Sequence, residues 1–270
     1  MLNEIKTTSN MSAEQAKQHE TQAADVKFLL STIGEHPKKV LEVGCGCGRI
    51  LVQLAKAGHD VTGFDVDDDG LNEISAKACG LNNISCHRAD AVHDDWGIGF
   101  DVVVLAGNIL FNIENIESGI EYKKAQELFI QKAAAALVPG GYVYIDYGPF
   151  APNGRTLMRP GQSCEDDGSI YGRWEETDDA GNIEIRSMTP GVFDESTGIL
   201  KFKRYLELRL LDGRIIKEES ERVKHYATLE QIHSWLSDAG FTIKHEYEDY
   251  AKNPINSGSR AVIIYAQQKF

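Results

Sequence analysis

The sequence predicts an α/β domain, with a mostly parallel sheet covered by helices on both faces and one antiparallel β insertion. Two patterns support this. From residue 39, short apolar runs alternate with amphipathic stretches, which is typical of strands alternating with helices. From Gly148 to about residue 226, turn-rich segments instead separate strands in which apolar and polar residues alternate, which is typical of an antiparallel sheet. The 270 residues, 42% of them hydrophobic, suffice for one large domain that carries an insertion.

The first predicted element is a helix over residues 12–33. Apolar residues recur there at nearly helical spacing, and Gly34 and Pro37 end the pattern. We expect residues 1–36 to form an N-terminal helical cap. Strands are then predicted at 39–43, 61–65, 84–90 and 100–106, with helices at 49–58 and 71–80 between them.

The second half begins with a helix predicted around 117–137, which Pro139-Gly140-Gly141 ends. A fifth strand follows at 141–147. The insertion is predicted over 148–226, as a substrate lid or an oligomer contact. A helix at 228–240 and strands at 241–250 and 260–268 then return to the first pattern. Residues 1–147 and 227–270 are therefore expected to form one domain.

Composition excludes several classes of function. The net charge is −13, from 28 Lys and Arg against 41 Asp and Glu, which argues against broad binding of a phosphate backbone. Ten of these acids lie within residues 60–101, against Lys77 and Arg88, so that stretch carries −8. The chain has no long apolar run and no secretory signal at its N-terminus, so a cytoplasmic protein without a membrane span is expected.

Five cysteines, an odd number, are expected to be free thiols in such a chain. Cys45-x-Cys47 has no second Cys or His pair near it at the spacing of zinc ligands. We therefore predict no metal site.

The strongest motif is a glycine-rich turn, Glu42-Val43-Gly44-Cys45-Gly46-Cys47-Gly48, which follows an apolar strand and opens a helix. Glycines allow a ligand to approach the backbone closely, and helix N-termini favour polar groups. A nicotinamide dinucleotide requires G-x-G-x-x-G. Counted from Gly44 the third position is Arg49, and counted from Gly46 it is Leu51, so neither register fits.

The form E-x-G-x-G-x-G resembles motif I of the class I S-adenosylmethionine (SAM) methyltransferases, and further motifs follow in that family's order. Asp65 ends the second strand, where the family has an acidic residue that binds both ribose hydroxyls, and Val66 matches its apolar contact with adenine. Asp90 matches the residue that recognises the adenine amino group. The end of the fourth strand matches the site of the methionine part, and Val138-Pro139-Gly140-Gly141 is another family feature.

The resemblance covers residues 38–147 and 228–267. It implies a Rossmann-like sheet of seven strands with an antiparallel last strand, SAM as cofactor and S-adenosylhomocysteine (SAH) as product. The cofactor contacts that it implies are Glu42, Gly44, Cys45, Gly46, Gly48, Asp65, Val66, Asp90, Ala91 and Ala106.

The run Asp65-Val66-Asp67-Asp68-Asp69-Gly70 also copies the first half of a calcium-binding EF-hand loop. The twelfth position of that loop is Ala76 and not the glutamate that calcium requires. We therefore interpret Asp67 to Asp69 as negative charge at a helix N-terminus.

Asn108 and Tyr147 are predicted to position the substrate. Gly107-Asn108-Ile109-Leu110-Phe111 resembles a stretch of the glycine N-methyltransferase-like group of small-molecule enzymes, in which the Asn helps to hold the substrate. That group's I-D-H-R becomes Ile145-Asp146-Tyr147-Gly148 here, so its carboxylate-binding arginine is missing. A loop cap for Asn108 and a packed aromatic ring for Tyr147 are the alternatives.

The leading hypothesis is methyl transfer to nitrogen or oxygen of a small metabolite. The absence of an N-P-P-Y-type sequence after the fourth strand and the charge of −13 favour a small molecule over nucleic acid. Two alternatives stay open: methylation of a protein or an RNA that docks on the insertion, and SAM binding without catalysis. A homodimer is also compatible with the sequence.

Overall fold

The computed structural model describes residues 24–113, 121–148, 172–177, 180–189, 191–259 and 261–269. The chain divides into two compact units, one of Glu20–Phe150 with Ala227–Phe270 and the other of Met1–His19 with Ala151–Tyr226. Of the predicted N-terminal helix, residues 24–33 are helical, and its beginning lies outside the described residues. Among the helices that the structure describes, none is long and apolar enough to cross a membrane.

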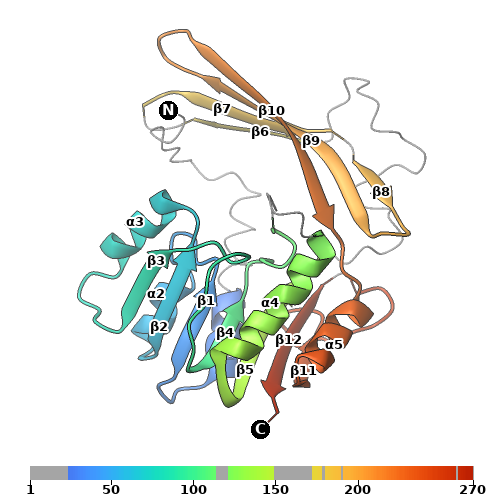
Figure 1. Cartoon of the computed structure of the whole chain (residues 1–270). Helices are drawn as coiled ribbons and strands as arrows, with labels where there is room; N and C mark the ends of the chain where they lie inside the picture. The colour runs from blue at the N-terminus through green and yellow to red at the C-terminus, as the bar shows by residue number, and fades with distance from the viewer. Residues whose placement is uncertain are drawn as a thin grey trace. The chain divides into compact units, whose positions relative to one another are not determined.

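The larger unit is built on one seven-stranded sheet with the order β11-β12-β5-β4-β1-β2-β3 (Figure 1). Neighbouring strands from β3 to β5 are parallel, and β12 is antiparallel to both β5 and β11. The predicted fold class is therefore confirmed. The strands are β1 (Lys39–Val43), β2 (Asp60–Asp65), β3 (Ile84–Arg88), β4 (Phe100–Leu105), β5 (Leu137–Tyr147), β11 (Phe241–Tyr247) and β12 (Val262–Gln268).

Helices cover both faces of this sheet because the strand side chains alternate between two apolar clusters. Leu41 and Val43 of β1 pack with α4 (Tyr122–Ala136) and α5 (Leu229–Asp238). Val40 packs on the other face with the helix at 24–33, α2 (Leu51–Lys56) and α3 (Asp68–Lys77). A parallel sheet needs both faces buried, and the continuous buried runs at the ends of β1 and β4 meet this need.

The helix ends follow local capping rules. Asp67 is the N-cap of α3 and accepts a hydrogen bond from the Asp69 backbone NH at 3.1 Å, which confirms the predicted acidic helix N-terminus. Thr228 and Gln231 form a capping box at the start of α5. Several expected boundaries were wrong: α2 begins at Leu51 and not at residue 49, and α3 begins at Asp68 and not at residue 71. The strand β5 begins at Leu137, directly after α4, and not at residue 141.

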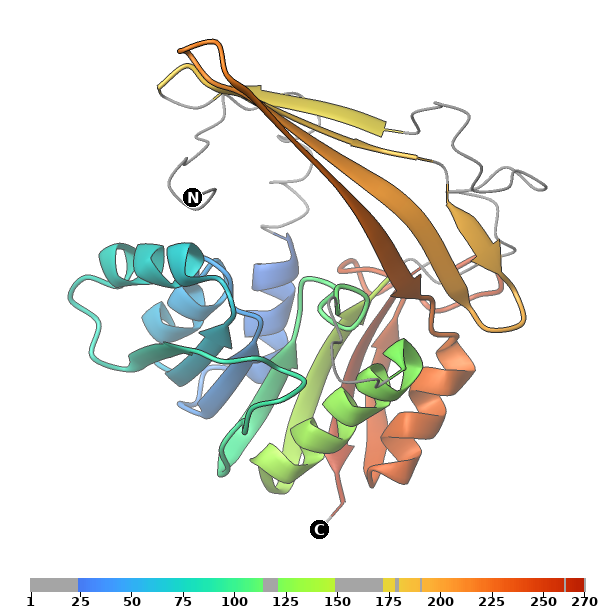
Figure 2. The same cartoon turned by 45° about the horizontal axis from the view of Figure 1, so that its top comes forward.

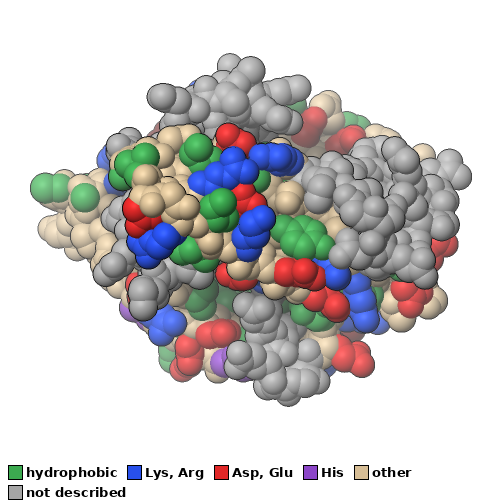
Figure 3. Space-filling view, turned by 90° about the horizontal axis from the view of Figure 1, so that it is seen from above, with side chains coloured by type: hydrophobic (Ala, Val, Ile, Leu, Met, Phe, Trp, Pro, Cys, Tyr) green, Lys and Arg blue, Asp and Glu red, His purple; other side chains and the backbone are tan. Residues whose placement is uncertain are grey.

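The smaller unit is an antiparallel sheet, as predicted for this part of the chain (Figure 2). Its strands are β6 (Gly172–Thr177), β7 (Ile183–Met188), β8 (Val192–Asp194), β9 (Ile199–Arg209) and β10 (Ile215–His225), in the order β10-β9-β7-β6 with β8 paired to β9. Gly213, at φ +85°, lies in the turn between β9 and β10. The short strand β8 was not predicted. Basic, acidic and apolar side chains are interspersed over the described part of the face shown in Figure 3.

Candidate functional site

The glycine-rich loop after β1 is tied to the end of β2. The backbone NH groups of Gly44 and Cys45 both donate to the Phe64 carbonyl oxygen, at 2.9 and 3.0 Å. Gly44, Gly46 and Gly48 all have positive φ, at 70°, 50° and 78°, a conformation that glycine adopts without steric cost. The loop therefore depends on these three residues.

The three glycines differ in what surrounds them. A Cβ at Gly44 would lie 2.6 Å from the Ile109 side chain, and one at Gly48 would lie 2.7 Å from Ile74, so a side chain at either position would require that isoleucine to move. A Cβ at Gly46 would meet nothing within 4 Å. The backbone at Gly46 thus borders open space, which a ligand would need in order to approach it.

Asp65, at the end of β2, holds this loop with its carboxylate. Its Oδ2 accepts from the Gly46 NH at 2.8 Å, and its Oδ1 accepts from the Asp67 NH at 3.0 Å. The next side chain, Val66, is apolar and 56% exposed. A half-buried carboxylate beside an exposed apolar side chain is suited to a ligand that has both hydroxyl groups and an apolar ring.

The turn after β3 is organised by Asp90. Its Oδ1 accepts from the backbone NH groups of Val92 and His93, at 2.7 and 3.1 Å, and the Asp94 Oδ2 accepts from the Asp90 NH at 2.7 Å. Because β1 to β4 are parallel, their carboxyl ends meet at one edge of the sheet. That edge therefore gathers the predicted contacts Gly44, Cys45, Gly46, Gly48, Asp65, Val66, Asp90, Ala91 and Ala106.

Glu42 lies within β1, below the loop, and is only 4% exposed. Burial raises its pKa to about 8, although Arg49 opposes the shift. Its Oε2 has no hydrogen-bond partner among the described residues. Arg49 forms a two-pronged ion pair with Asp25 of the N-terminal helix, both N–O distances being 2.7 Å. The sequence interpretation missed this pair, although an arginine directly after the third glycine was a signal for it.

Asn108 connects the ends of β4 and β5. Its side-chain NH₂ donates to the Gly148 carbonyl oxygen and its Oδ1 accepts from the Gly148 NH at 3.1 Å. The backbone NH groups of Gly107 and Asn108 donate to the Asp146 carboxylate, at 3.2 and 2.7 Å, and the Tyr250 hydroxyl donates to it at 3.4 Å. Burial raises the pKa of Asp146 to about 6. Asp146 was not among the predicted residues, although it ends a predicted strand beside Tyr147.

Tyr147 is 1% exposed, and its hydroxyl accepts from the Ala227 NH at 2.7 Å. The contacts of both side chains are those expected from the two alternatives, a loop cap for Asn108 and a packed aromatic ring for Tyr147. Contact of either residue with a substrate stays a prediction.

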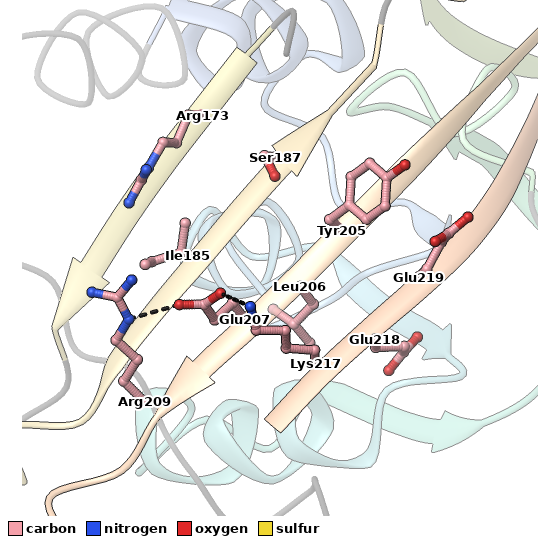
Figure 4. A pocket seen from close by; sticks show the side chains of 10 residues that line it. All are labelled: Arg173, Ile185, Ser187, Tyr205, Leu206, Glu207, Arg209, Lys217, Glu218 and Glu219. Atoms are coloured by element: carbon pink, nitrogen blue, oxygen red, sulfur yellow. Dashed lines mark hydrogen bonds and ion pairs between the residues drawn. The ribbon is translucent and has the colours of Figure 1, made fainter. Parts of the chain in front are cut away.

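A separate cavity of about 480 Å³ lies on the sheet of the smaller unit (Figure 4). Glu207 forms ion pairs there with Arg209 at 2.7 Å and Lys217 at 2.9 Å. The lining carries three basic side chains and three acidic ones, so it has no net charge. Within the described ranges, no group of three or more His, Cys, Asp or Glu side chains is arranged to hold a metal ion.

Comparison with known proteins finds a similarity within the larger unit. A model described as a methyltransferase domain matches residues 40–141. A ubiquinone biosynthesis O-methyltransferase of Shewanella pealeana is 33% identical over 110 residues, which are 40% of this chain and 42% of that protein. The chain thus spans about two fifths of the length of the curated relatives that it matches.

Solved structures agree over nearly the whole chain. A SAM-dependent methyltransferase from Clostridium acetobutylicum has a TM-score of 0.68 at 12% identity and covers 92% of both chains. A sugar N-methyltransferase from a Streptoalloteichus species has a TM-score of 0.65 at 16% identity and covers 98% of both chains. At such identities the likeness shows the fold. The chain therefore has the fold of SAM-dependent methyltransferases, and its residues 40–141 match a methyltransferase domain.

Proposed function

We propose that this protein transfers the methyl group of SAM to a nitrogen or oxygen atom of a small-molecule acceptor. The observation that carries the proposal is the group of features at one edge of the sheet. These are a glycine loop that borders open space, a carboxylate and an exposed apolar side chain after β2, and a turn after β3 that Asp90 caps. This edge is where α/β folds of this kind bind nucleotides.

In this proposal each part of the methyl donor has a partner. Asp65 accepts hydrogen bonds from the ribose hydroxyls while keeping its bonds to the loop, since each carboxylate oxygen has two lone pairs. Val66 packs against the adenine ring, and Asp90 with the Ala91 NH recognises the adenine edge. The buried Glu42, with Oε2 unpartnered among the described residues, is suited to form a hydrogen bond at the methionine end.

The sulfonium of SAM supplies an activated methyl group, and the acceptor must be held in line with the C–S bond at about 3 Å. A lone pair of the acceptor forms the new bond to carbon, the C–S electrons return to sulfur, and the acceptor loses one proton. The chain needs no covalent intermediate for this. Asn108 and Asp146 fix the ends of β4 and β5 relative to each other, so these strand ends present a rigid acceptor side.

Two observations support a small-molecule acceptor. The net charge of −13 disfavours a nucleic acid. The relatives and structural neighbours include proteins named as a ubiquinone biosynthesis O-methyltransferase and a sugar N-methyltransferase.

The proposal is tested with the purified chain, SAM labelled with tritium in the methyl group, and a cell extract separated into small molecules, protein and nucleic acid. Label is expected in the small-molecule fraction, and mass spectrometry of the labelled product identifies the methylated atom. Label confined to protein or RNA would contradict the small-molecule acceptor. Tight SAM binding without turnover on any fraction would contradict catalysis.

A further inference from the structure

A lysine of α4 holds the turn that follows β3. The Lys132 Nζ lies 3.0 Å from the carbonyl oxygen of Ala91, 2.8 Å from that of Val92 and 2.7 Å from that of Asp94. An ammonium group has three donors. One side chain therefore supplies a charged hydrogen-bond donor to three of the carbonyl groups of this turn.

Trp96 reinforces the same contact. Its ring nitrogen donates to the Ala91 carbonyl oxygen at 2.9 Å, and its ring centroid lies 5.7 Å from the Lys132 Nζ. The ring is buried and packs edge to face on Phe129 of α4, at 5.3 Å between centroids. The carbonyl side of the turn is thus anchored to α4 by two residues.

The opposite side of the turn is fixed by Asp90, whose Oδ1 accepts the NH groups of Val92 and His93. The positive charge of Lys132 also offsets a local excess of negative charge. The carboxylates of Asp90, Asp94 and Asp95 favour its charged form, while burial lowers its pKa. Asp90 thus holds the NH groups of the turn, and Lys132 with Trp96 holds its carbonyl groups.

We infer that Lys132 is a positioning residue for recognition of the adenine base. It holds the turn at 90–94 in one conformation, so that the Asp90 carboxylate and the Ala91 NH present an acceptor and a donor at fixed positions. The inference rests on the proposed function and on the adenine contact proposed for Asp90. Without Lys132, the Val92 and Asp94 carbonyl groups lose this donor, the Ala91 carbonyl keeps only the Trp96 ring nitrogen, and the carboxylates repel one another. Base recognition therefore weakens while the ribose contact at Asp65 does not.

The test compares two ligands by calorimetry: SAH, and S-inosylhomocysteine, in which a carbonyl replaces the adenine amino group. The wild-type chain is expected to prefer SAH. Lys132→Met should weaken SAH binding about tenfold, the effect of one good hydrogen bond, and weaken the inosine analogue less than about threefold. Lys132→Arg, which keeps the charge and the donors, should stay within about threefold of the wild-type preference.

Lys124→Met is the matched control, because Lys124 lies on the same helix and pairs at the surface with Glu127. It should leave both affinities unchanged. Lys132→Gln gives a second neutral variant if Lys132→Met fails to fold, as judged by circular dichroism. A folded neutral variant with an unchanged ratio of the two affinities, or with an equal loss for both ligands, would overturn the role in base recognition. A wild-type chain that binds neither SAM nor SAH would instead overturn the proposed function.

Discussion

At the scale of single residues, Asp65 is the most direct test of the cofactor assignment. Asp65→Ala removes the acceptor proposed for two ribose hydroxyls, and hydrogen bonds to charged groups contribute about 1.5–3 kcal/mol each. SAM affinity measured by calorimetry is therefore expected to fall at least about 100-fold. Asp60→Ala, at the exposed start of the same strand, is the control. Unchanged affinity in a folded Asp65→Ala chain would count against the assignment.

Glu42 makes stability depend on pH. Its pKa rises from 4.5 to about 8 on folding, so between these values the folded chain retains a proton that the unfolded chain has lost. The stabilisation is complete below pH 4.5 and is lost as the pH rises through about 8. In this range Glu42 should lower the free energy of unfolding by about 1.4 kcal/mol per pH unit.

Glu42→Gln removes this dependence. Urea unfolding at pH 5.5, 7 and 8.5 should show a shallower decline for the variant than for the wild type, and the exposed Glu35→Gln should keep the wild-type slope. Parallel declines for Glu42→Gln and the wild type would show that Glu42 is not the titrating group.

At the scale of an element, substitutions in the glycine loop can distinguish an effect on SAM binding from an effect on folding. Gly46→Ala adds a Cβ where nothing lies within 4 Å, so the protein should fold with a loss of only about 1–2 kcal/mol from the positive φ. The methyl group nevertheless occupies the space proposed for SAM. We expect this variant to lose SAM binding while keeping nearly the wild-type melting temperature.

Gly48→Ala should behave differently, because its Cβ would lie 2.7 Å from the Ile74 side chain in addition to requiring a φ of +78°. Overpacking of this kind costs about 1–3 kcal/mol. Thermal unfolding should therefore show a clearly larger loss than for Gly46→Ala. Equal melting temperatures for the two variants would contradict the packing described here.

At the scale of the whole molecule, the cofactor should stabilise the folded chain by mass action. SAM at 100 times its dissociation constant should add about 2.7 kcal/mol to the free energy of unfolding. Hydrogen exchange should slow in the unit of Glu20–Phe150 and Ala227–Phe270, where the proposed contacts lie. Protection confined to residues 172–226 would place the ligand on the other unit. Light scattering of the same samples tests whether the chain forms a homodimer.

The sequence by itself determined the fold class and the order of the binding motifs. Local features carried both: the alternation of apolar runs with amphipathic stretches, three glycines at fixed spacing, and acidic residues after the second and third strands. Local rules also predicted Asp67 as part of an acidic helix start. The beginning of β5 was missed because Leu137 continues an apolar pattern that fits a helix or a strand, and sheet pairing decides between them.

Only the tertiary structure decided which side chains meet. Asp25 and Arg49 are 24 positions apart, and Lys132 is about 40 positions from the turn that it holds. No local pattern encodes such pairs. The structure also gave Tyr147 and Asn108 partners within the protein, Ala227 and Gly148. The physical reason is that a polar side chain takes its role from burial and from the groups within hydrogen-bond distance, and folding sets both.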